Sequence, residues 1–211
     1  MKEQYTALTR STQAVTPETR TQEFLSESSA GTQRRILWID GVGGFLLVES
    51  DEVLIGQAIP GTPVDVAVVG DLSRRAAVLR RTGGDYLLQP FQQTCVDHQA
   101  IDRPQLLRNT AEIQLGSRVK LQFTKPSPLS ATARLDMTSL NRFKPNVDGI
   151  LLLSDSCIIG PNAGSHVLCP DWRSELLLFR QGSEWYFRSL VEVQVDGKPM
   201  QGQIPVTAGM R

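Results

Sequence analysis

The chain has 211 residues, with 22 basic and 22 acidic side chains and a formal net charge of zero. This balance provides no overall field to concentrate nucleic acid or an anionic membrane surface, and we expect neither as a partner. No apolar run approaches the roughly 20 residues that a membrane-spanning helix needs, and the polar N-terminal residues do not resemble a signal peptide. Three widely spaced cysteines, Cys95, Cys157 and Cys169, indicate free thiols in a reducing compartment, so we expect a cytoplasmic location.

Residues 1–33 are rich in Thr, Ser, Gln, Glu and Arg and poor in apolar side chains, which predicts a disordered tail. Thr16-Pro17 resembles a proline-directed phosphorylation site. We therefore regard the tail as a candidate Ser/Thr kinase substrate, whose phosphothreonine would dock in this chain or in a partner. The alternative is a plain hydrophilic leader. The threonines of the tail are Thr6, Thr9, Thr12, Thr16, Thr19, Thr21 and Thr32.

Short apolar or alternating runs begin at Ile36 and are separated by Gly, Pro, Asp and Ser, a pattern typical of strands and turns. No segment predicts a long helix, and residues 102–109 suit a brief turn at most. We therefore predict an all-β protein. Strands are expected at 36–39, 44–49, 53–55, 65–69, 76–80, 85–89, 112–115 and 118–123, and in the second half at 131–137, 149–153, 157–159, 166–168, 175–180, 184–188 and 191–195.

The second half of the chain repeats the pattern of the first half in order. The aligned blocks are 44–56 with 149–160, 71–80 with 171–180, 83–88 with 182–187 and 96–99 with 195–198. Ordered agreement of this kind predicts two tandem modules, 34–125 and 126–211, and the alternative is one large sandwich whose strands look alike. The second copy ends where the first continues with further strands. We therefore expect it to be incomplete, either because the chain is a fragment or because a strand from elsewhere closes it.

The chain lacks the sequence motifs of serine hydrolases, zinc proteases and P-loop nucleotide-binding proteins. Gly41-Val-Gly-Gly44 lacks the third glycine of a dinucleotide-binding loop and precedes a strand, so we interpret it as a turn. His166 and Cys169 would lie on opposite faces of a strand with only Cys157 as a nearby soft ligand, which disfavours a metal site. We therefore expect no enzyme, no catalytic residue, no metal and no cofactor.

Residues 36–123 carry, in order, elements that resemble the forkhead-associated (FHA) family of phosphothreonine-recognising β-sandwich domains. The matching elements are Leu54-Ile-Gly56, residues 64–68, Asp71-Leu-Ser-Arg74 followed by Ala77-Val-Leu79, residues 85–88, residues 96–99, Leu107 and Glu112-Ile-Gln-Leu-Gly116. The internal repeat extends the resemblance to the second copy. The resemblance implies two tandem FHA-like β-sandwiches behind the tail, the second of them incomplete or degenerate.

The resemblance also implies a phosphopeptide-binding site at one end of the first sandwich. Ser73 and Arg74 stand where the family has its phosphate-contacting serine and the neighbouring arginine, with Arg75 beside them. Gln57 stands at an arginine position, and Asp97-His98 stand at the asparagine-glycine turn that holds the peptide backbone. An amide in place of a cation, together with a carboxylate near the phosphate, implies that phosphate binding is weakened or lost.

In the second copy, Pro161 and Arg173 occupy the positions of Gln57 and Ser73, which favours a structural or protein-contact role there. We therefore expect a non-enzymatic interaction module for signalling or scaffolding, whose partner is a protein with or without phosphothreonine. The alternative is a structural assembly protein that binds unmodified surfaces or self-associates through strand edges. The sequence leaves the oligomeric state open.

Overall fold

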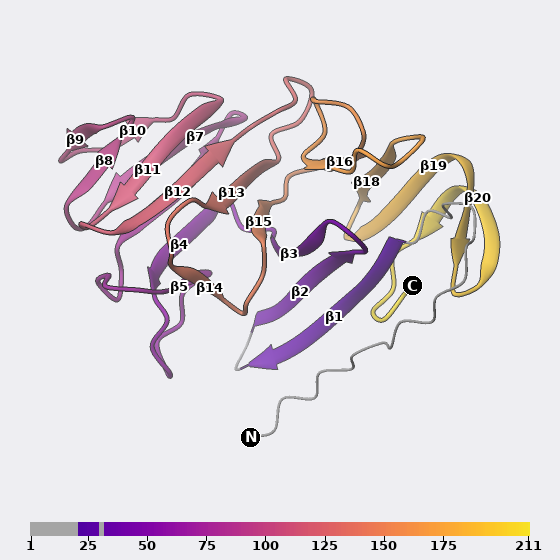
Figure 1. The fold of residues 1–211 in the computed structure, drawn as a ribbon, viewed down its shortest axis with the longest axis horizontal. Coiled ribbons are helices and arrows are strands. Elements are labelled where there is room, and N and C mark those ends of the chain that lie inside the picture. Colours follow the sequence, from indigo (N-terminus) through magenta and orange to yellow (C-terminus); the bar gives the residue numbers. More distant parts are fainter. Residues whose placement is uncertain (1–20, 30–31) are drawn as a thin grey trace.

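The computed structural model describes residues 21–29 and 32–211, with side chains from Arg35 onward. The described residues form twenty strands, and they contain no helix of the length and apolarity needed to cross a membrane. The prediction of an all-β fold is therefore confirmed. The strands form three sheets, which we name sheets A, B and C (Figure 1).

Sheet A has nine strands in the order β1-β2-β3-β15-β13-β12-β11-β8-β9. Neighbouring strands are antiparallel except β3 and β15, which run parallel to each other with Phe45 opposite Gly149 and Val48 opposite Leu152. The strands are β1 (Thr21–Ser29), β2 (Thr32–Ile39), β3 (Gly43–Val48), β8 (Thr94–Val96), β9 (Gln99–Ile101), β11 (Thr110–Leu115), β12 (Val119–Thr124), β13 (Ala133–Met137) and β15 (Gly149–Leu152).

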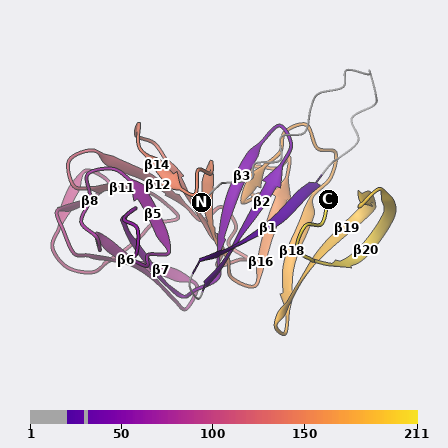
Figure 2. The same ribbon diagram turned by 90° about the horizontal axis from the view of Figure 1, so that it is seen from below.

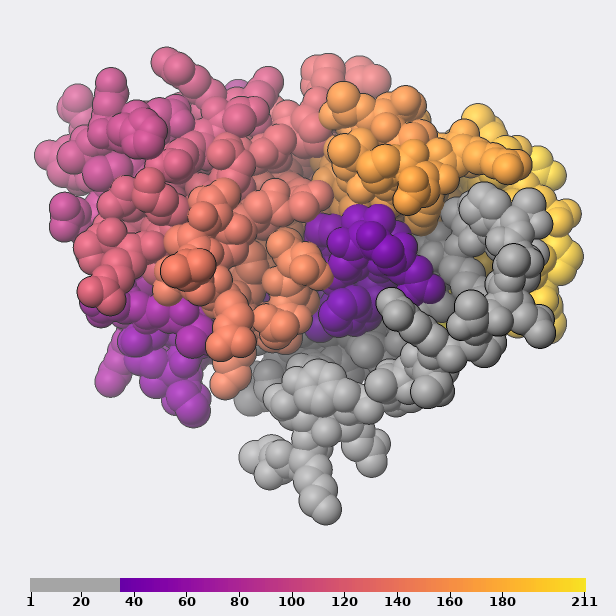
Figure 3. Space-filling view, in the orientation of Figure 1, coloured from indigo at the N-terminus to yellow at the C-terminus, as the bar shows by residue number. Residues whose placement is uncertain are grey.

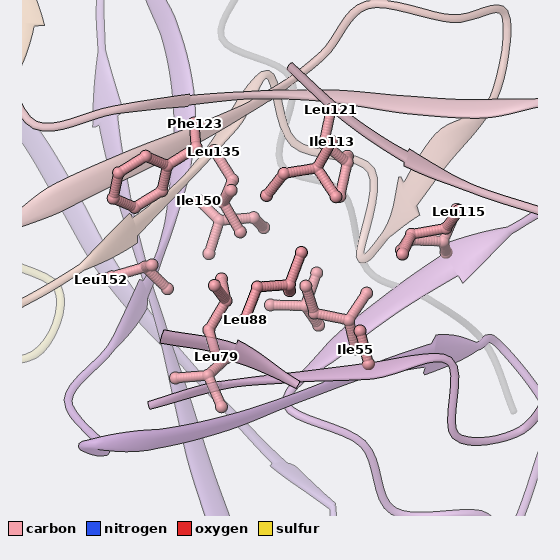
Figure 4. Packing of buried hydrophobic residues seen from close by; sticks show 14 of the residues in the cluster. Ile55, Leu79, Leu88, Ile113, Leu115, Leu121, Phe123, Leu135, Ile150 and Leu152 are labelled. Carbon is pink, nitrogen blue, oxygen red and sulfur yellow. The ribbon is translucent and has the colours of Figure 1, made fainter. Parts of the chain in front are cut away.

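Sheet B has six strands in the order β10-β7-β6-β4-β5-β14 and packs on one face of sheet A. Its strands are β4 (Glu52–Gln57), β5 (Val66–Val69), β6 (Ala77–Thr82), β7 (Asp85–Pro90), β10 (Gln105–Leu106) and β14 (Arg142–Lys144). In Figure 4, Ile55, Leu79 and Leu88 of sheet B point toward Leu121 and Leu135 of sheet A. Buried and less buried residues alternate along β7, β11 and β12, because each of these strands turns one face to this core.

Sheet C has five strands in the order β17-β16-β18-β19-β20 and packs on the opposite face of sheet A. Its strands are β16 (Ser156–Gly160), β17 (Val167–Leu168), β18 (Leu176–Gln181), β19 (Glu184–Val195) and β20 (Lys198–Pro205). Figure 2 shows β1, β2 and β3 standing between the sandwich on one side and sheet C on the other. On the face drawn in Figure 3, the orange surface of the residues that follow Leu152 lies directly against the indigo and purple surface of the residues that follow Arg35.

Burial on both faces explains the unbroken apolar runs at the centre of sheet A. Leu46 and Ile150 face the core shared with sheet B, whereas Phe45, Leu47 and Leu151 face the core shared with sheet C. A strand that is covered on both sides needs apolar residues at every position rather than at alternate ones. The sequences of β3 and β15 have this composition.

The internal repeat is visible in the strand order. Strands β7, β6, β4 and β5 lie side by side in sheet B, and β19, β18, β16 and β17 lie in the same order in sheet C. The parallel pair at the end of each series also corresponds, since β4 is parallel to β5 and β16 is parallel to β17. Asp97-His98 and Asp196-Gly197 also form matching two-residue turns with positive φ angles.

The two copies do not form two separate sandwiches divided at residue 125. Strands β13, β14 and β15, which belong to the predicted second module, pair with β12, β5 and β3 of the first. Sheet C has no second sheet of its own and instead uses the other face of sheet A. The structure thus closes the short second copy with strands from elsewhere, because the central strands of sheet A are shared by both cores.

The predicted tail also differs from the structure in part. Residues 21–29 form β1, which pairs antiparallel with β2 from Thr21 opposite Ile39 to Ser29 opposite Thr32. Backbone pairing needs no apolar side chains, so composition alone did not reveal this strand. Thr32 and Gln33 begin β2, whereas residues 1–20 and 30–31 of the predicted tail, including Thr16-Pro17, lie outside the described residues.

Candidate functional site

Five segments meet at one end of the sandwich formed by sheets A and B, and we call this surface the loop end. They comprise residues 57–60, 70–76, 91–93, 116–118 and 138–142. Each segment directly follows or precedes a strand. Strands β4, β5, β7 and β11 run toward this end, and strands β6, β8, β12 and β14 run away from it. Connecting segments of this kind carry binding residues on a rigid scaffold in many proteins.

Hydrogen bonds fix the 70–76 loop against its neighbours. The Gln57 backbone N–H donates to the Ser73 carbonyl at 3.0 Å, and the Gln57 side-chain amide donates to the Gly70 carbonyl at 3.1 Å. The Ser73 backbone N–H donates to the Gln92 side-chain oxygen at 2.8 Å, and the Ala76 N–H donates to the Ile55 carbonyl at 2.8 Å. The loop is therefore held by both the β4 end and the 91–93 segment.

Gly56 lets this loop approach β4 closely. A Cβ atom at position 56 would overlap the carbonyl oxygen of Arg74, and the Val64 side chain lies at 3.2 Å from the same point. The glycine is thus required for contact with backbone, which cannot move aside as a flexible side chain can. Gly160 repeats the arrangement in sheet C, where a Cβ would lie 2.8 Å from the Glu175 side chain.

The loop presents the polar groups of Asp71, Ser73, Arg74 and Arg75 to solvent, since all four residues are exposed. The Arg75 guanidinium lies over the Phe91 ring at 5.5 Å from its centroid, and Phe91 is itself 48% exposed. Ala76, by contrast, is fully buried in the core. In the part of the chain that the structure describes, neither Arg74 nor Arg75 forms an ion pair. The loop therefore presents a hydroxyl and two guanidinium groups that are available to an anion.

Asp97 and His98 lie away from these groups. They form the β8–β9 turn, where the Asp97 carboxylate accepts a hydrogen bond from the Glu112 N–H at 2.9 Å and His98 Nδ1 lies 3.5 Å from the Glu112 carboxylate. Glu112 precedes Gly116 by four residues on β11, a separation of about 13 Å at the rise of a strand. Of the six predicted site residues, the structure brings together Gln57, Ser73, Arg74 and Arg75, and it does not bring Asp97 and His98 to them.

Gln92 is a further residue of the loop end that contacts Ser73 directly. Its side-chain oxygen accepts the Ser73 N–H at 2.8 Å, and its side-chain nitrogen lies 3.3 Å from the position of a Cβ on Gly116. No motif singled out Gln92 in the sequence. The fold brings it to Ser73, because β7 ends beside the 70–76 loop.

The corresponding end of sheet C differs from the loop end. Pro161 follows Gly160 and has no N–H to donate, so the bond that Gln57 makes with Ser73 has no counterpart there. The Asn162 side chain instead donates to the Glu175 carboxylate at 2.7 Å. Arg173 is exposed, whereas Ser174 is half-buried. The second copy therefore keeps the strands of the repeat but not the hydrogen bond by which Gln57 holds the 70–76 loop.

Cys157, His166 and Cys169 are buried between sheets A and C and do not form a metal centre. No cluster of three or more His, Cys, Asp or Glu side chains suited to a metal is found among the described residues. Burial raises the pKa of Cys157 to about 12 and that of Cys169 to about 11, which leaves both as neutral thiols. His166 accepts the Ile158 N–H on Nδ1 at 2.9 Å, so its neutral ring serves the packing of β16.

His166 is expected to make the protein sensitive to acid. Burial is the main cause that lowers its pKa from 6.5 to about 4. Since the unfolded chain takes up the proton first, the stabilisation is full above pH 6.5 and falls as the pH drops toward 4, by about 3 kcal/mol at most. Urea unfolding of wild type and His166→Gln should differ in pH slope over this range. His98→Gln, at the exposed histidine, is the control, and equal slopes for His166→Gln and wild type would contradict the assignment.

In comparisons with known proteins, no protein-family model and no curated protein matches the chain.

Proposed function

We propose that the protein is a non-enzymatic interaction module that binds an anionic group of a protein partner, with phosphothreonine as the candidate, at the loop end. Ser73 and Arg74 are the proposed contacts, with Arg75 beside them. The observation that carries the proposal is the fixed 70–76 loop, whose backbone is held by Gln57 and Gln92 while its hydroxyl and guanidinium groups remain exposed. A loop whose backbone is already fixed loses less freedom when an anion binds, which favours affinity.

Two features of the loop end set the expected strength of this site. Gln57 uses its side-chain amide to hold Gly70, so it supports the loop rather than supplying a charge-assisted donor. The Asp97 carboxylate lies with Glu112, too far away to repel a bound phosphate strongly in water. We therefore propose that phosphate binding is weakened by the missing arginine and by the exposed Asp71 carboxylate of the same loop, but is not opposed by Asp97.

The double variant Ser73→Ala, Arg74→Ala is expected to lose phosphate-dependent binding. Removal of the hydroxyl and one guanidinium eliminates two charge-assisted hydrogen bonds, which should weaken binding by about 100-fold. The full chain is titrated with a degenerate phosphothreonine peptide library and with its unphosphorylated twin. The matched control is Arg173→Ala, Ser174→Ala at the equivalent loop of sheet C. Equal binding of both libraries by the wild type, or unchanged binding by the double variant, would contradict the proposal.

The chain's own tail is a candidate ligand for the same site. A phosphothreonine in residues 1–33 would be tethered to the loop end, and the resulting effective concentration would compensate for a weak site. Three free thiols fit the reducing cytoplasm in which such a kinase substrate would act. Absence of phosphate on the tail threonines in protein isolated from its native cells would contradict this part of the proposal.

Self-association through the edge of sheet C is the second candidate function. At the six sheet ends, β9, β10, β14 and β17 are two or three residues long, whereas β1 has nine residues and β20 has eight; β20 pairs only with β19 in the described part of the chain. Residues 199–205 carry no charge, and Leu190 and Met200 nearby are exposed. Uncharged edges of this length favour pairing with another strand. Light scattering over a concentration series tests this reading, with Gln203→Lys expected to reduce any dimer.

A further inference from the structure

Four exposed arginines surround the loop end. Arg74 and Arg75 belong to the 70–76 loop, Arg118 lies in the β11–β12 turn, and Arg142 begins β14. The five segments of the loop end contain one acidic residue, Asp71. Four positive charges against one negative charge are unusual on this chain, since its total charge is zero. The loop end is therefore a local concentration of positive charge.

The segments that carry these arginines are in direct contact. Arg142 pairs with Val69 at the end of β5, and the Asn141 side chain donates to the Val69 carbonyl at 3.2 Å. On the other side of the 70–76 loop, a Cβ on Gly116 would lie 3.5 Å from the Asp71 carbonyl oxygen. The β14 start and the β11–β12 turn thus flank the loop that presents Ser73 and Arg74.

The loop-end arginines have no acidic partner within 4 Å among the described residues, as is also true of Arg108 and Arg173. Seven basic side chains form ion pairs within 4 Å elsewhere in the structure: Arg35, Arg80, Arg81, Lys120, Lys125, Arg134 and Arg180. Among the described residues, none of the four loop-end arginines does so. Clustered charges of one sign repel each other, and a bound anionic partner would relieve that repulsion.

We infer that Arg118 and Arg142 form an accessory subsite that selects acidic residues flanking the anion held by Ser73 and Arg74. The inference rests on the proposed function, and it adds the chemistry of the partner: an acidic protein segment. A protein segment fits better than nucleic acid, because the chain has no net positive charge and the positive surface is confined to one sandwich end. Nucleic-acid bases stack on exposed aromatic rings, and the exposed ring of the loop end is that of Phe91. The Arg75 guanidinium lies over one face of this ring, so that face is not open to a base.

The test compares two phosphothreonine peptides with the full chain, one flanked by neutral residues and one flanked by four Asp or Glu residues. The wild type is expected to bind the acidic peptide about tenfold more tightly, since two exposed ion pairs each contribute a modest amount. Arg118→Glu, Arg142→Glu should abolish that preference while keeping the discrimination against unphosphorylated peptide. Arg108→Glu, Arg173→Glu makes the same change in charge away from the loop end and should retain the preference.

The outcomes separate this inference from the proposed function. Equal affinity of the wild type for both peptides would overturn the accessory subsite while leaving phosphate binding intact. A preference that survives Arg118→Glu, Arg142→Glu would also overturn it, and so would stronger binding of a single-stranded DNA oligonucleotide than of the acidic peptide. Failure of the proposed function has a different signature: affinity would follow the acidic flank in wild type but would not depend on the phosphate.

Discussion

A chain that ends at Lys125 is expected to lose cooperative unfolding altogether. The truncation removes six buried side chains from the core between sheets A and B: Ala133, Leu135, Phe143, Val147, Ile150 and Leu152. It also leaves β3 and β12 without their partners β15 and β13, and β5 without β14. Each large core side chain contributes about 2 to 5 kcal/mol, so the sum exceeds the stability of an ordinary domain.

A chain that ends at Asp155 is the control for this truncation. It retains every residue of the core between sheets A and B and every strand that pairs with the first half of the chain. Because it exposes Phe45 and Leu151 on the other face of sheet A, it should fold but self-associate at high concentration. Circular dichroism during urea unfolding distinguishes the two chains. A cooperative transition in the 1–125 chain would contradict the shared-sheet architecture and favour two independent modules.

Gly56→Ala is expected to lower the free energy of unfolding by about 3 kcal/mol, because overpacking against backbone has no cheap relaxation. The added methyl group would overlap the Arg74 carbonyl, so either β4 or the 70–76 loop must shift. A shift of the loop would also break the bond from Gln57 N–H to the Ser73 carbonyl. The substitution should therefore reduce both stability and anion binding.

Gly164→Ala is the matched control for this substitution. A Cβ at position 164 has no neighbour within 4 Å, and its backbone angle is open to any residue. The change in stability should stay within about 0.5 kcal/mol. Chemical denaturation of both variants measures the difference. A Gly56→Ala protein that is as stable as the control would show that the loop does not approach β4 as described.

The strand positions were predictable because most strands carry a local signal. The predicted 85–89 and 118–123 correspond to β7 and β12, whose alternation reflects one buried face. Strands β8, β9, β10, β14 and β20 were not predicted, and all of them except β20 have only two or three residues, too few to show a periodicity. Residues 102–109 suggested a turn and contain β10.

The sharing of sheet A was not predictable from local patterns. The apolar runs at 45–48 and 150–153 looked like equivalent strands of two modules, and in the structure β3 and β15 pair with each other. The composition of the two runs indicated burial on both faces of each strand. It did not indicate which strand pairs with which, because β3 and β15 are about 100 residues apart in the sequence. The unbroken hydrophobicity of both runs was the only trace of the second core.

The residues of the 70–76 loop were predictable from the sequence, whereas the flanking arginines Arg118 and Arg142 were not. Gly56, Ser73 and Arg74 followed from the family resemblance, and the structure places them in one loop contact. The structure places Asp97-His98 in the β8–β9 turn, away from the 70–76 loop, and an Asx residue with positive φ is typical of a simple hairpin as well. Arg118 and Arg142 had no motif, since only the fold brings their segments beside the 70–76 loop.

The measurement that tests the central claim most directly is a nuclear magnetic resonance titration of the ¹⁵N-labelled full chain with a phosphothreonine peptide. The account predicts that the largest amide shifts occur at the loop end, at Ser73, Arg74, Gln92 and Gly116, and that they vanish with the unphosphorylated peptide. Shifts concentrated at the Asp97-His98 turn or along β20, or no shifts at all, would contradict a phosphate-binding loop end.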